Sequence, residues 1–251
     1  MYPILFTIPG IDYPISSFGA MMALGFLAAY WLVVRELPGK GIDPELSSNL
    51  LLFVMLGGVL GAKIYFATDM TLREGGPWTS YFFRRDGITW YGGLFGAIAS
   101  LTLASRFYKL ELRRLLEAGA VATAVGQSFG RVGCFLVGDD YGVASNLPWA
   151  IAFPNGAPPV FETVHPTQLY EVLWLLPIAL RLDSRRTQSP FLFGEYMAAN
   201  GFGRIIIESL RRNPEVALGL TEPQWIGVGL VIAGIATWVF YQRKDAAADP
   251  A

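Results

Sequence analysis

Apolar runs long enough to cross a membrane recur along this chain, and they constrain its fold more than any other feature. A helix needs about 20 mostly apolar residues to cross about 30 Å of hydrocarbon. Seven such runs can be drawn, at residues 15–34, 48–68, 88–105, 115–137, 167–182, 191–210 and 223–241. Charges, proline or glycine bound each of them. We therefore predict an all-α integral membrane protein with seven transmembrane helices.

The composition supports this class of protein. Hydrophobic residues make up 53% of the 251 residues and charged residues only 16%, which is too apolar for an ordinary soluble domain. Apart from the small, polar tail at 246–251, no linker separates the runs, so residues 1–251 are expected to form a single polytopic membrane domain. The first dozen residues lack the basic segment of a cleaved signal peptide.

Charge and cysteine content exclude several classes of function. A net charge of −1 gives no case for nucleic acid as a partner. The single cysteine, Cys134, excludes an internal disulfide framework and a cysteine-based zinc site. At its position Cys134 is more typical of a small packing residue than of a nucleophile.

Basic residues in the short loops predict the orientation in the membrane. With the N-terminus outside, the inner loops and tail carry Arg35, Lys40, Arg106, Lys109, Arg113, Arg114, Arg181, Arg185, Arg186, Arg243 and Lys244. The outer loops carry only Arg73, Arg84, Arg85, Arg211 and Arg212. This bias predicts an outer N-terminus and a cytoplasmic C-terminus.

Apart from Arg181, which lies at the inner end of run 167–182 and is counted with the inner loop, the basic residues inside the drawn runs are Lys63, Arg131 and Arg204. In this orientation all three lie in the outer halves of their helices, where an intramembrane cation indicates a functional site. The oppositely directed helices bring to the same depth Phe18, Tyr91, His165, Gln168 and Glu171. The pattern predicts one polar cavity on the outer side.

The cations of this cavity call for an anion. The one available at that depth is a phospholipid phosphate, which arginine binds with favourable geometry. The alternative is internal neutralisation, in which Arg204 pairs with Glu208 and Arg131 pairs with Asp139 or Glu171. We prefer lipid phosphate, because paired charges are costly in a bundle that could use leucine. Ion conduction is a third interpretation, but no chain of acids continues inward.

Local patterns add four expectations. Gly57 and Gly61 are spaced for close helix approach. The polar, aromatic segment 69–87 is expected in the membrane interface. The long loop 139–164 is rich in turn formers, and such loops often carry function. Pro166 suits the first position of the next helix, with His165 either as its cap or as a site residue.

Three segments together resemble the prolipoprotein diacylglyceryl transferase family. They are Gly130 to Gly142, with Arg131-Val132-Gly133-Cys134-Phe135 at its start, His165-Pro166-Thr167-Gln168-Leu169-Tyr170-Glu171, and Gly203-Arg204-Ile205-Ile206-Ile207-Glu208. The resemblance extends over nearly the whole chain, including Gly92-Gly93-Leu94-Phe95-Gly96 and the region of Lys63.

This resemblance implies a seven-helix enzyme of the bacterial inner membrane, with its N-terminus and active site on the periplasmic side and its C-terminus in the cytoplasm. Such enzymes transfer diacylglyceryl from phosphatidylglycerol to the lipobox cysteine thiol of a preprolipoprotein signal peptide and release glycerol 1-phosphate. The implied partners are phosphatidylglycerol, or another anionic phospholipid, and the preprolipoprotein. No metal or organic cofactor is implied, and we expect a monomer.

The resemblance also assigns site residues. The family's two essential arginines correspond to Arg131 and Arg204, and its glycine motif to Gly138 and Gly142. The catalytic residues are then expected to be Arg131, Arg204, Tyr91 and Asp139. The substrate-binding residues are expected to be Arg131, Arg204, Lys63, Gly138, Gly142, His165, Gln168, Tyr170, Glu171 and Glu208.

The chain departs from the family pattern at five positions. Tyr91 stands where the family has histidine, Cys134 replaces asparagine, Asp139 replaces glutamate, and tyrosines are replaced by Phe18 and Asn200. Attack by a thiol requires a thiolate and a stabilised phosphate leaving group. A phenol, whose ordinary pKa is about 10, is a poorer base than imidazole. Asp139, or Tyr91 polarised by Lys63, is therefore the expected base.

Two functional hypotheses follow from these residues. The leading one is a divergent transferase that moves diacylglyceryl to a thiol or to an altered acceptor. The alternative is a non-catalytic phospholipid-binding or accessory membrane homologue. A transporter is a distant third.

Overall fold

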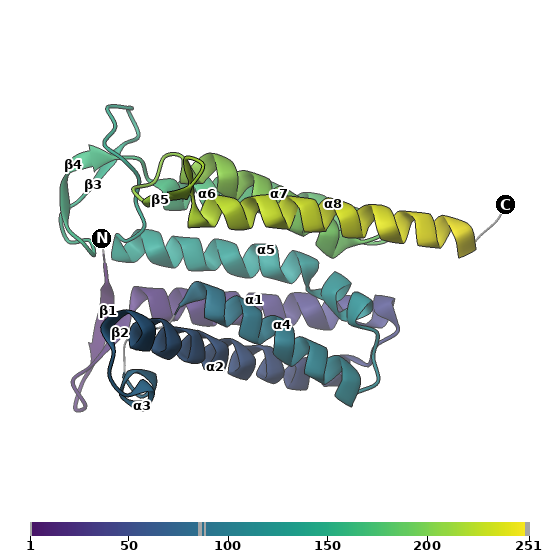
Figure 1. Cartoon of the computed structure of the whole chain (residues 1–251). Helices are drawn as coiled ribbons and strands as arrows, with labels where there is room; N and C mark the ends of the chain where they lie inside the picture. Colours follow the sequence, from purple (N-terminus) through teal and green to yellow (C-terminus); the bar gives the residue numbers. More distant parts are fainter. Residues whose placement is uncertain (1, 85–86, 88, 249–251) are drawn as a thin grey trace. The chain divides into compact units, whose positions relative to one another are not determined.

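The computed structural model describes residues 2–84, 87 and 89–248 (Figure 1). The chain divides into two compact units. Val33–Ala118 forms one, which we call the middle unit, and Met1–Leu32 with Gly119–Ala251 forms the other, the terminal unit. Helices α1 (Ser17–Glu36) and α5 (Leu112–Val137) contribute residues to both.

Within the described residues, one long helix forms for each predicted apolar run. Besides α1 and α5 these are α2 (Ser47–Glu74), α4 (Trp90–Phe107), α6 (Thr167–Arg185), α7 (Leu192–Glu208) and α8 (Glu222–Ala248). Four helical segments in this part of the chain have the length and apolarity of a membrane span: Ser17–Glu36, Pro44–Glu74, Leu112–Val137 and Glu222–Ala247. The protein is thus mostly helical and suited to a membrane, while the seven-span topology stays a prediction.

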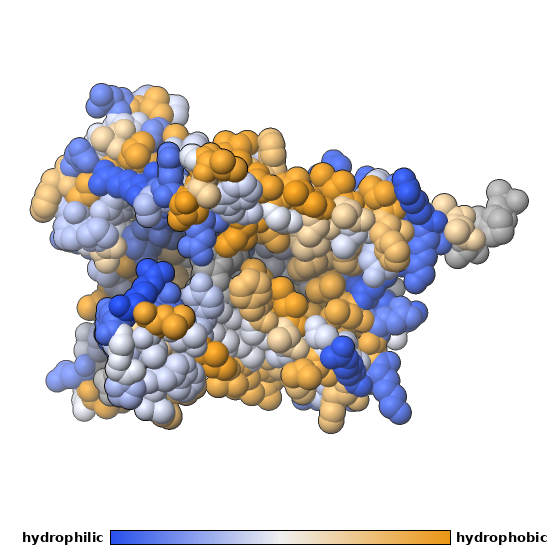
Figure 2. Space-filling model, in the orientation of Figure 1, coloured by the Kyte–Doolittle hydropathy of each residue, from blue (hydrophilic) through white to orange (hydrophobic). Residues whose placement is uncertain are grey.

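The exposed surface of α8 illustrates this character. Figure 2 shows hydrophobic side chains along the helix and hydrophilic ones towards its C-terminal end. Large apolar side chains such as Ile232, Ile235 and Phe240 are exposed on it. In water such a surface would be costly, whereas in lipid it is the expected one.

Short antiparallel strand pairs qualify the all-α prediction. They are β1 (Ile4–Ile8) with β2 (Tyr13–Ser16), β3 (Ile151–Phe153) with β4 (Val160–Val164), and β5 (Glu215–Ala217) with β6 (Leu220–Thr221). All three lie in the terminal unit, at segments that connect or precede helices (Figure 1). Two-residue to five-residue strands carry too little periodicity to be predicted from sequence.

In the middle unit, α2 extends beyond the predicted apolar run 48–68 and into segment 69–87. Helix α2 continues to Glu74, where Gly75 at φ +75° ends it, and Arg73 Nε donates to Asp69 Oδ1 at 2.7 Å on the added turn. A short helix, α3 (Trp78–Phe82), follows. Segment 69–87 thus begins with the last turn of α2, which this (i, i+4) pair stabilises, and its location in the membrane interface stays a prediction.

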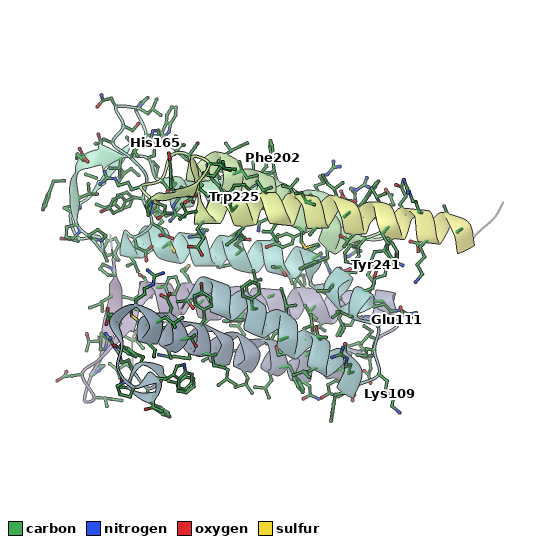
Figure 3. All side chains as sticks on the ribbon, viewed as in Figure 1. Lys109, Glu111, His165, Phe202, Trp225 and Tyr241 are labelled. Atoms are coloured by element: carbon green, nitrogen blue, oxygen red, sulfur yellow. The ribbon has the colours of Figure 1, made fainter. Side chains whose placement is uncertain are left out.

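Close packing of α2 on α4 confirms the expected role of the α2 glycines. A Cβ atom on Gly61 would clash with the carbonyl oxygen of Gly92, and one on Gly57 with Ser100. The absence of side chains lets the two backbones touch. At the far end of this pair, an apolar cluster includes Leu37, Leu50 and Ala104, and the connection from α4 to α5 carries Lys109 and Glu111 (Figure 3).

In the terminal unit, glycines likewise allow α7 and α8 to pack closely. Gly201 and Gly194 of α7 face Gly227 and Gly234 of α8, and added Cβ atoms would lie within 3.0 Å of the opposite carbonyl oxygens. Helix α6 packs on α7 through Trp174, whose Nε1 donates to the carbonyl oxygen of Ala199 at 3.0 Å. These contacts fix α6, α7 and α8 as one group.

Candidate functional site: an arginine–carboxylate cluster

Six charged side chains of the terminal unit form one network, which we call the arginine cluster. Its members come from α5, α6, α7 and the residues that follow α5 and α7. They are Arg131, Arg204, Arg211, Asp140, Glu171 and Glu208. Three guanidinium groups thus meet three carboxylates, so the formal charge of the cluster is zero.

Glu171 lies at the centre of the arginine cluster. Its Oε2 is 2.7 Å from Arg131 Nε, and its Oε1 is 3.1 Å from Arg204 Nη1 and 3.4 Å from Arg211 Nη1. The side chain is only 6% exposed. Because a buried carboxylate must be paired to stay ionised, this one carboxylate depends on all three arginines.

Asp140, the most exposed member of the arginine cluster, bridges Arg131 and Arg211. Its Oδ2 is 2.9 Å from Arg131 Nη1 and its Oδ1 is 2.5 Å from Arg211 Nη2. On the other side of Glu171, Arg204 Nη2 lies 3.2 Å from Glu208 Oε2, an (i, i+4) pair on α7. Asn213 Nδ2 donates to Glu208 Oε1 at 2.5 Å. Each arginine therefore contacts at least two carboxylates.

Two glycines bring the loop after α5 into this network. Gly138 adopts φ +77°, a conformation that favours glycine, and donates its N–H to the carbonyl oxygen of Cys134 at 2.8 Å, which ends α5. Gly142 forms a β-bridge with Arg211. A Cβ atom on Gly142 would lie 2.5 Å from the carbonyl oxygen of Leu210 and 2.9 Å from His165 Cβ. The close approach places Arg211 beside Asp140.

The adjacent acids Asp139 and Asp140 differ in their environments. Burial raises the pKa of the Asp139 carboxyl above its usual value, although a hydrogen bond with the Cys134 thiol opposes the shift. Burial also acts to raise the pKa of Asp140, but the charges of Arg211 and Arg131 outweigh it and the net shift is downward. Asp140 is thus held as a carboxylate, and Asp139 is the better proton acceptor.

Gln168 contributes to the site through the backbone of the loop. Its Nε2 donates to the carbonyl oxygen of Asp139, while its Oε1 is buried and accepts no hydrogen bond within the described part of the chain. Asp139 Oδ1 is likewise buried and accepts no hydrogen bond from the described residues. Unsatisfied buried acceptors are uncommon in folded proteins, and these two lie beside the arginine cluster.

The pairing expected from internal neutralisation is present. Arg204 pairs with Glu208, and Arg131 pairs with Glu171. For Arg131 the second partner is Asp140. Binding of a lipid phosphate, the preferred interpretation of the sequence, stays a prediction.

The Cys134 thiol and the two aspartates also form a group of possible metal ligands, with ligand atoms within 4.8 Å of one another. Arg131 Nη1, however, lies 2.9 Å from Asp140 Oδ2 and 3.8 Å from Cys134 Sγ. The guanidinium already supplies the positive charge here, and it would repel a metal cation. The donor set therefore does not fit a metal site.

His165 is not the cap of α6, which corrects one expectation. Pro166 occupies the N-cap position, and no side chain caps the helix. The backbone of His165 bonds to the loop, because its carbonyl oxygen accepts from Gly142 N–H at 2.9 Å. Its side chain (Figure 3) instead places Nδ1 3.1 Å from the Tyr170 hydroxyl. Tyr170 in turn accepts from Trp149 Nε1 at 2.8 Å.

His165 and Tyr170 thus form an aromatic group with Trp149. The contacts described for these two side chains are with each other and with Trp149, and none reaches the arginine cluster. Their predicted role in substrate binding stays a prediction.

Lys63 and Tyr91 belong to the middle unit. Lys63 Nζ donates to the carbonyl oxygen of Arg84 at 2.5 Å. Tyr91 lies in the first turn of α4, but its side chain is outside the described residues, as is the predicted polarisation of Tyr91 by Lys63. Phe18, in the terminal unit, packs against Gly133 on α5.

Two members of the cluster were missed by reasoning from the sequence. Arg211 was counted as an outer-loop charge, but it is buried and paired. Asp140 was given no role. The signal for Arg211 was its spacing, three residues after Glu208 and seven after Arg204, which keeps all three on one face when the helical turn continues.

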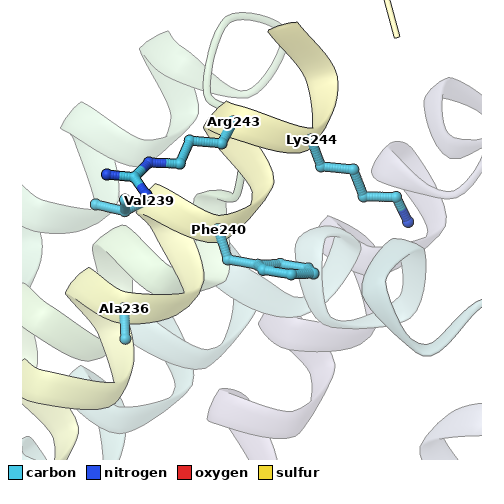
Figure 4. A pocket seen from close by; sticks show the side chains of 5 residues that line it. All are labelled: Ala236, Val239, Phe240, Arg243 and Lys244. Carbon is cyan, nitrogen blue, oxygen red and sulfur yellow. The ribbon is translucent and has the colours of Figure 1, made fainter. Parts of the chain in front are cut away.

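Among the described residues of the terminal unit, a small cavity and a shallow hollow differ in their distance from the site. A cavity of about 10 Å³ is lined by Glu171, Trp174, Leu175, Asn200, Gly203, Arg204 and Ile207, which is room for about one water molecule. A shallow hollow of about 470 Å³ near the end of α8 (Figure 4) is lined by Ala236, Val239, Phe240, Arg243 and Lys244. Only the first touches the arginine cluster.

Fold and site together define a class of protein: a helical membrane protein that buries arginine–carboxylate pairs at helix ends. The particular family follows from comparison with known proteins. The chain belongs to the prolipoprotein diacylglyceryl transferase family, whose sequence pattern matches residues 3–240. The predicted resemblance is confirmed.

Relatives from three organisms align with this chain over more than nine-tenths of their length. The phosphatidylglycerol–prolipoprotein diacylglyceryl transferase of Clostridium tetani is 32% identical over 241 residues, which covers 94% of this chain and 96% of the relative. The enzymes of the same name from Nitratidesulfovibrio vulgaris and Synechocystis are each 27% identical, and cover 93% and 97% of this chain and 91% of either relative.

Proposed function

We propose that this protein is a phosphatidylglycerol–prolipoprotein diacylglyceryl transferase of the bacterial inner membrane. The observation that carries the proposal is the arginine cluster, in which Arg131 and Arg204 are retained and lie around one buried glutamate. Family membership supports the same activity. The substrates would be phosphatidylglycerol and the lipobox cysteine of a preprolipoprotein.

The proposed reaction is a displacement at carbon. The lipobox thiolate attacks the glycerol carbon of the diacylglyceryl group, a C–S bond forms, and the C–O bond to phosphate breaks. Glycerol 1-phosphate leaves with the bonding electrons. Arginine groups positioned before the reaction stabilise the negative charge that develops on the leaving phosphate. Arg131 and Arg204 take this role.

The proton of the attacking thiol requires a base. Asp139 is the better supported candidate, because it lies beside the arginine cluster, keeps one buried acceptor without a donor, and has a raised pKa. Tyr91 is the other candidate, since the family places a catalytic histidine at this position. Lys63, Gln168, Glu171, Glu208, His165, Tyr170 and the loop glycines Gly138 and Gly142 are proposed to bind substrate.

We also infer the topology. Seven spans in one polytopic domain, with a periplasmic N-terminus and a cytoplasmic C-terminus, agree with the seven long helices and with the bias of basic residues. The active site would face the periplasm. The protein would act as a monomer.

Transfer of labelled diacylglyceryl from phosphatidylglycerol vesicles to a lipobox peptide tests the function. The purified wild-type protein should transfer the label, and Arg131→Ala should abolish transfer. A transfer rate in Arg131→Ala equal to that of the wild type would contradict the proposal. Activity that appears only in Tyr91→His would mean that the phosphate site is intact but the natural catalytic step is lost.

A second candidate is a non-catalytic phospholipid-binding homologue. The observation in its favour is that the arginine cluster is already neutralised internally. Complementation of a strain that lacks the authentic transferase separates the two candidates. Growth of the complemented strain would exclude the binding role as the whole function.

A further inference from the structure

We propose that Asp140 is an internal substitute for the substrate phosphate: when no lipid is bound it bridges Arg131 and Arg211, and the lipid phosphate displaces it. The identity of the lipid rests on the proposed function. The inference also makes Arg211 a third phosphate-binding arginine.

The geometry of Asp140 is that of a bound oxyanion. Its two carboxylate oxygens contact two different guanidinium groups, at 2.9 Å to Arg131 Nη1 and 2.5 Å to Arg211 Nη2. The non-bridging oxygens of a phosphodiester can make the same two contacts, because guanidinium groups accept carboxylate and phosphate in the same way. One anion position thus lies between Arg131 and Arg211.

Of the three carboxylates, Asp140 is the one that can leave. Its side chain is 47% exposed, whereas Glu171 is 6% and Glu208 0% exposed. The two glutamates project from α6 and α7, while Asp140 lies in the loop after α5. Moving either glutamate would take a buried carboxylate out of its ion pairs, whereas the half-exposed Asp140 can rotate into solvent while Arg131 and Arg211 stay paired with Glu171.

The backbone allows this exchange without opening the loop. Thr167 Oγ1 donates to the carbonyl oxygen of Asp140 at 2.7 Å, and Gly142 is anchored by its bridge to Arg211. Only the side chain has to rotate. The anion position would then be vacated while both arginines keep their places.

The charge balance also selects the ligand. Without Asp140 the cluster holds three guanidinium groups and two carboxylates, a net charge of +1. A phosphodiester carries one negative charge, so phosphatidylglycerol would restore neutrality inside a site of low dielectric. A zwitterionic phospholipid would bring an additional cation to the same place.

Binding of glycerol 1-phosphate to the purified full chain tests the inference independently of turnover. In Asp140→Asn the competing carboxylate is gone, and asparagine tolerates the backbone at Asp140, whose φ is +59°. If Asp140 fills the site about nine-tenths of the time, the dissociation constant should fall roughly tenfold. Arg211→Gln should raise it by a similar factor. Calorimetric titration measures both.

Glu162→Gln is the matched control. Glu162 pairs with Arg212 Nη2 at 2.8 Å, is 57% exposed and lies in the same long loop. The Glu162→Gln variant loses one negative charge, as Asp140→Asn does, but should leave the dissociation constant of glycerol 1-phosphate unchanged. An equal gain in affinity in Glu162→Gln would overturn the inference, since general loop charge would then explain the result.

Unchanged or weaker binding in Asp140→Asn would also overturn it. If that variant folds poorly, Asp140→Gly suits the same backbone and is judged by the same criterion. The proposed transferase function can fail independently of this inference. If no variant transfers diacylglyceryl but Asp140→Asn binds glycerol 1-phosphate more tightly, the inference about Asp140 stands. With arginine-dependent transfer but no change in binding, the transferase stands and the substitute role falls.

Discussion

Two arginine–carboxylate groups in the terminal unit differ in how completely they are satisfied. In one, Glu195 accepts from Arg185 Nε at 3.0 Å, from Ser189 Oγ at 2.7 Å and from Trp238 Nε1 at 3.3 Å. In the arginine cluster, by contrast, Asp140 is half exposed. Buried acceptors on Asp139 and Gln168 beside it lack a hydrogen bond within the described chain.

The difference separates a structural ion pair from a candidate site. An unmet buried hydrogen-bonding group costs about 1–3 kcal/mol, so a cluster that served stability alone would be expected to satisfy it, as Glu195 is satisfied. The arginine cluster has unmet acceptors beside it and contains a half-exposed acid, Asp140. These are the properties of a site prepared for a ligand.

The largest expected effect comes from matched removal of one arginine in each group. Arg204→Ala should lower the rate of diacylglyceryl transfer by about 100-fold or more, because a donor to the developing charge is lost. Arg185→Ala should leave the rate per folded molecule within about threefold. Both rates come from the peptide-transfer assay. Comparable losses in the two variants would remove the distinction between the groups.

A second effect concerns stability. Glu171→Gln leaves three guanidinium groups around a neutral amide, and breaking such a buried network costs about 3–5 kcal/mol. Glu195→Gln affects one arginine and should cost less, about 1–3 kcal/mol. Thermal unfolding in detergent measures the difference. A larger loss of stability in Glu195→Gln would contradict the central place given to Glu171.

The smallest effect is a pH dependence with opposite signs for the two neighbouring aspartates. The folded-state pKa of Asp140 is lowered, so its stabilising contribution is present above its unfolded pKa of about 4 and is lost as pH falls through the folded value. The melting temperature of the wild type should exceed that of Asp140→Asn at pH 7, and the gap should close in acid.

For Asp139 the sign reverses. Its folded-state pKa is raised, so the stability it contributes in acid is lost as pH rises through the folded value. Asp139→Asn should therefore gain melting temperature relative to the wild type as pH rises from 4 to 7. A parallel response of the two variants would contradict the contrast between these carboxyl groups.

The helices were largely predictable. Apolar runs such as 15–34 and 223–241 correspond to α1 (Ser17–Glu36) and α8 (Glu222–Ala248), which have the length and apolarity of a membrane span, and a segment in lipid must satisfy its own backbone hydrogen bonds. Ends were less predictable: α2 passed residue 68 and stopped at Gly75. Charged residues continue a helix as readily as apolar ones, so hydropathy alone cannot mark its end.

Part of the site was predictable for a similar reason. Arg204 and Glu208 are four residues apart on one helix, and their pairing follows from that spacing. Arg131 and Glu171 are 40 residues apart, and only the cost of intramembrane charge suggested that they meet. The contact between Asp140 and Arg211 had no such signal, since it depends on the turn at Gly138 and the bridge at Gly142.

The sequence by itself determined that the protein is helical, suited to a membrane and equipped with costly charges, because hydropathy and charge act along the chain. Tertiary structure alone decided which carboxylate each arginine contacts and that Asp140, rather than Asp139, bridges Arg131 and Arg211. That choice depends on a left-handed backbone turn and on a close contact that only a missing Cβ allows. Both are properties of packing in three dimensions.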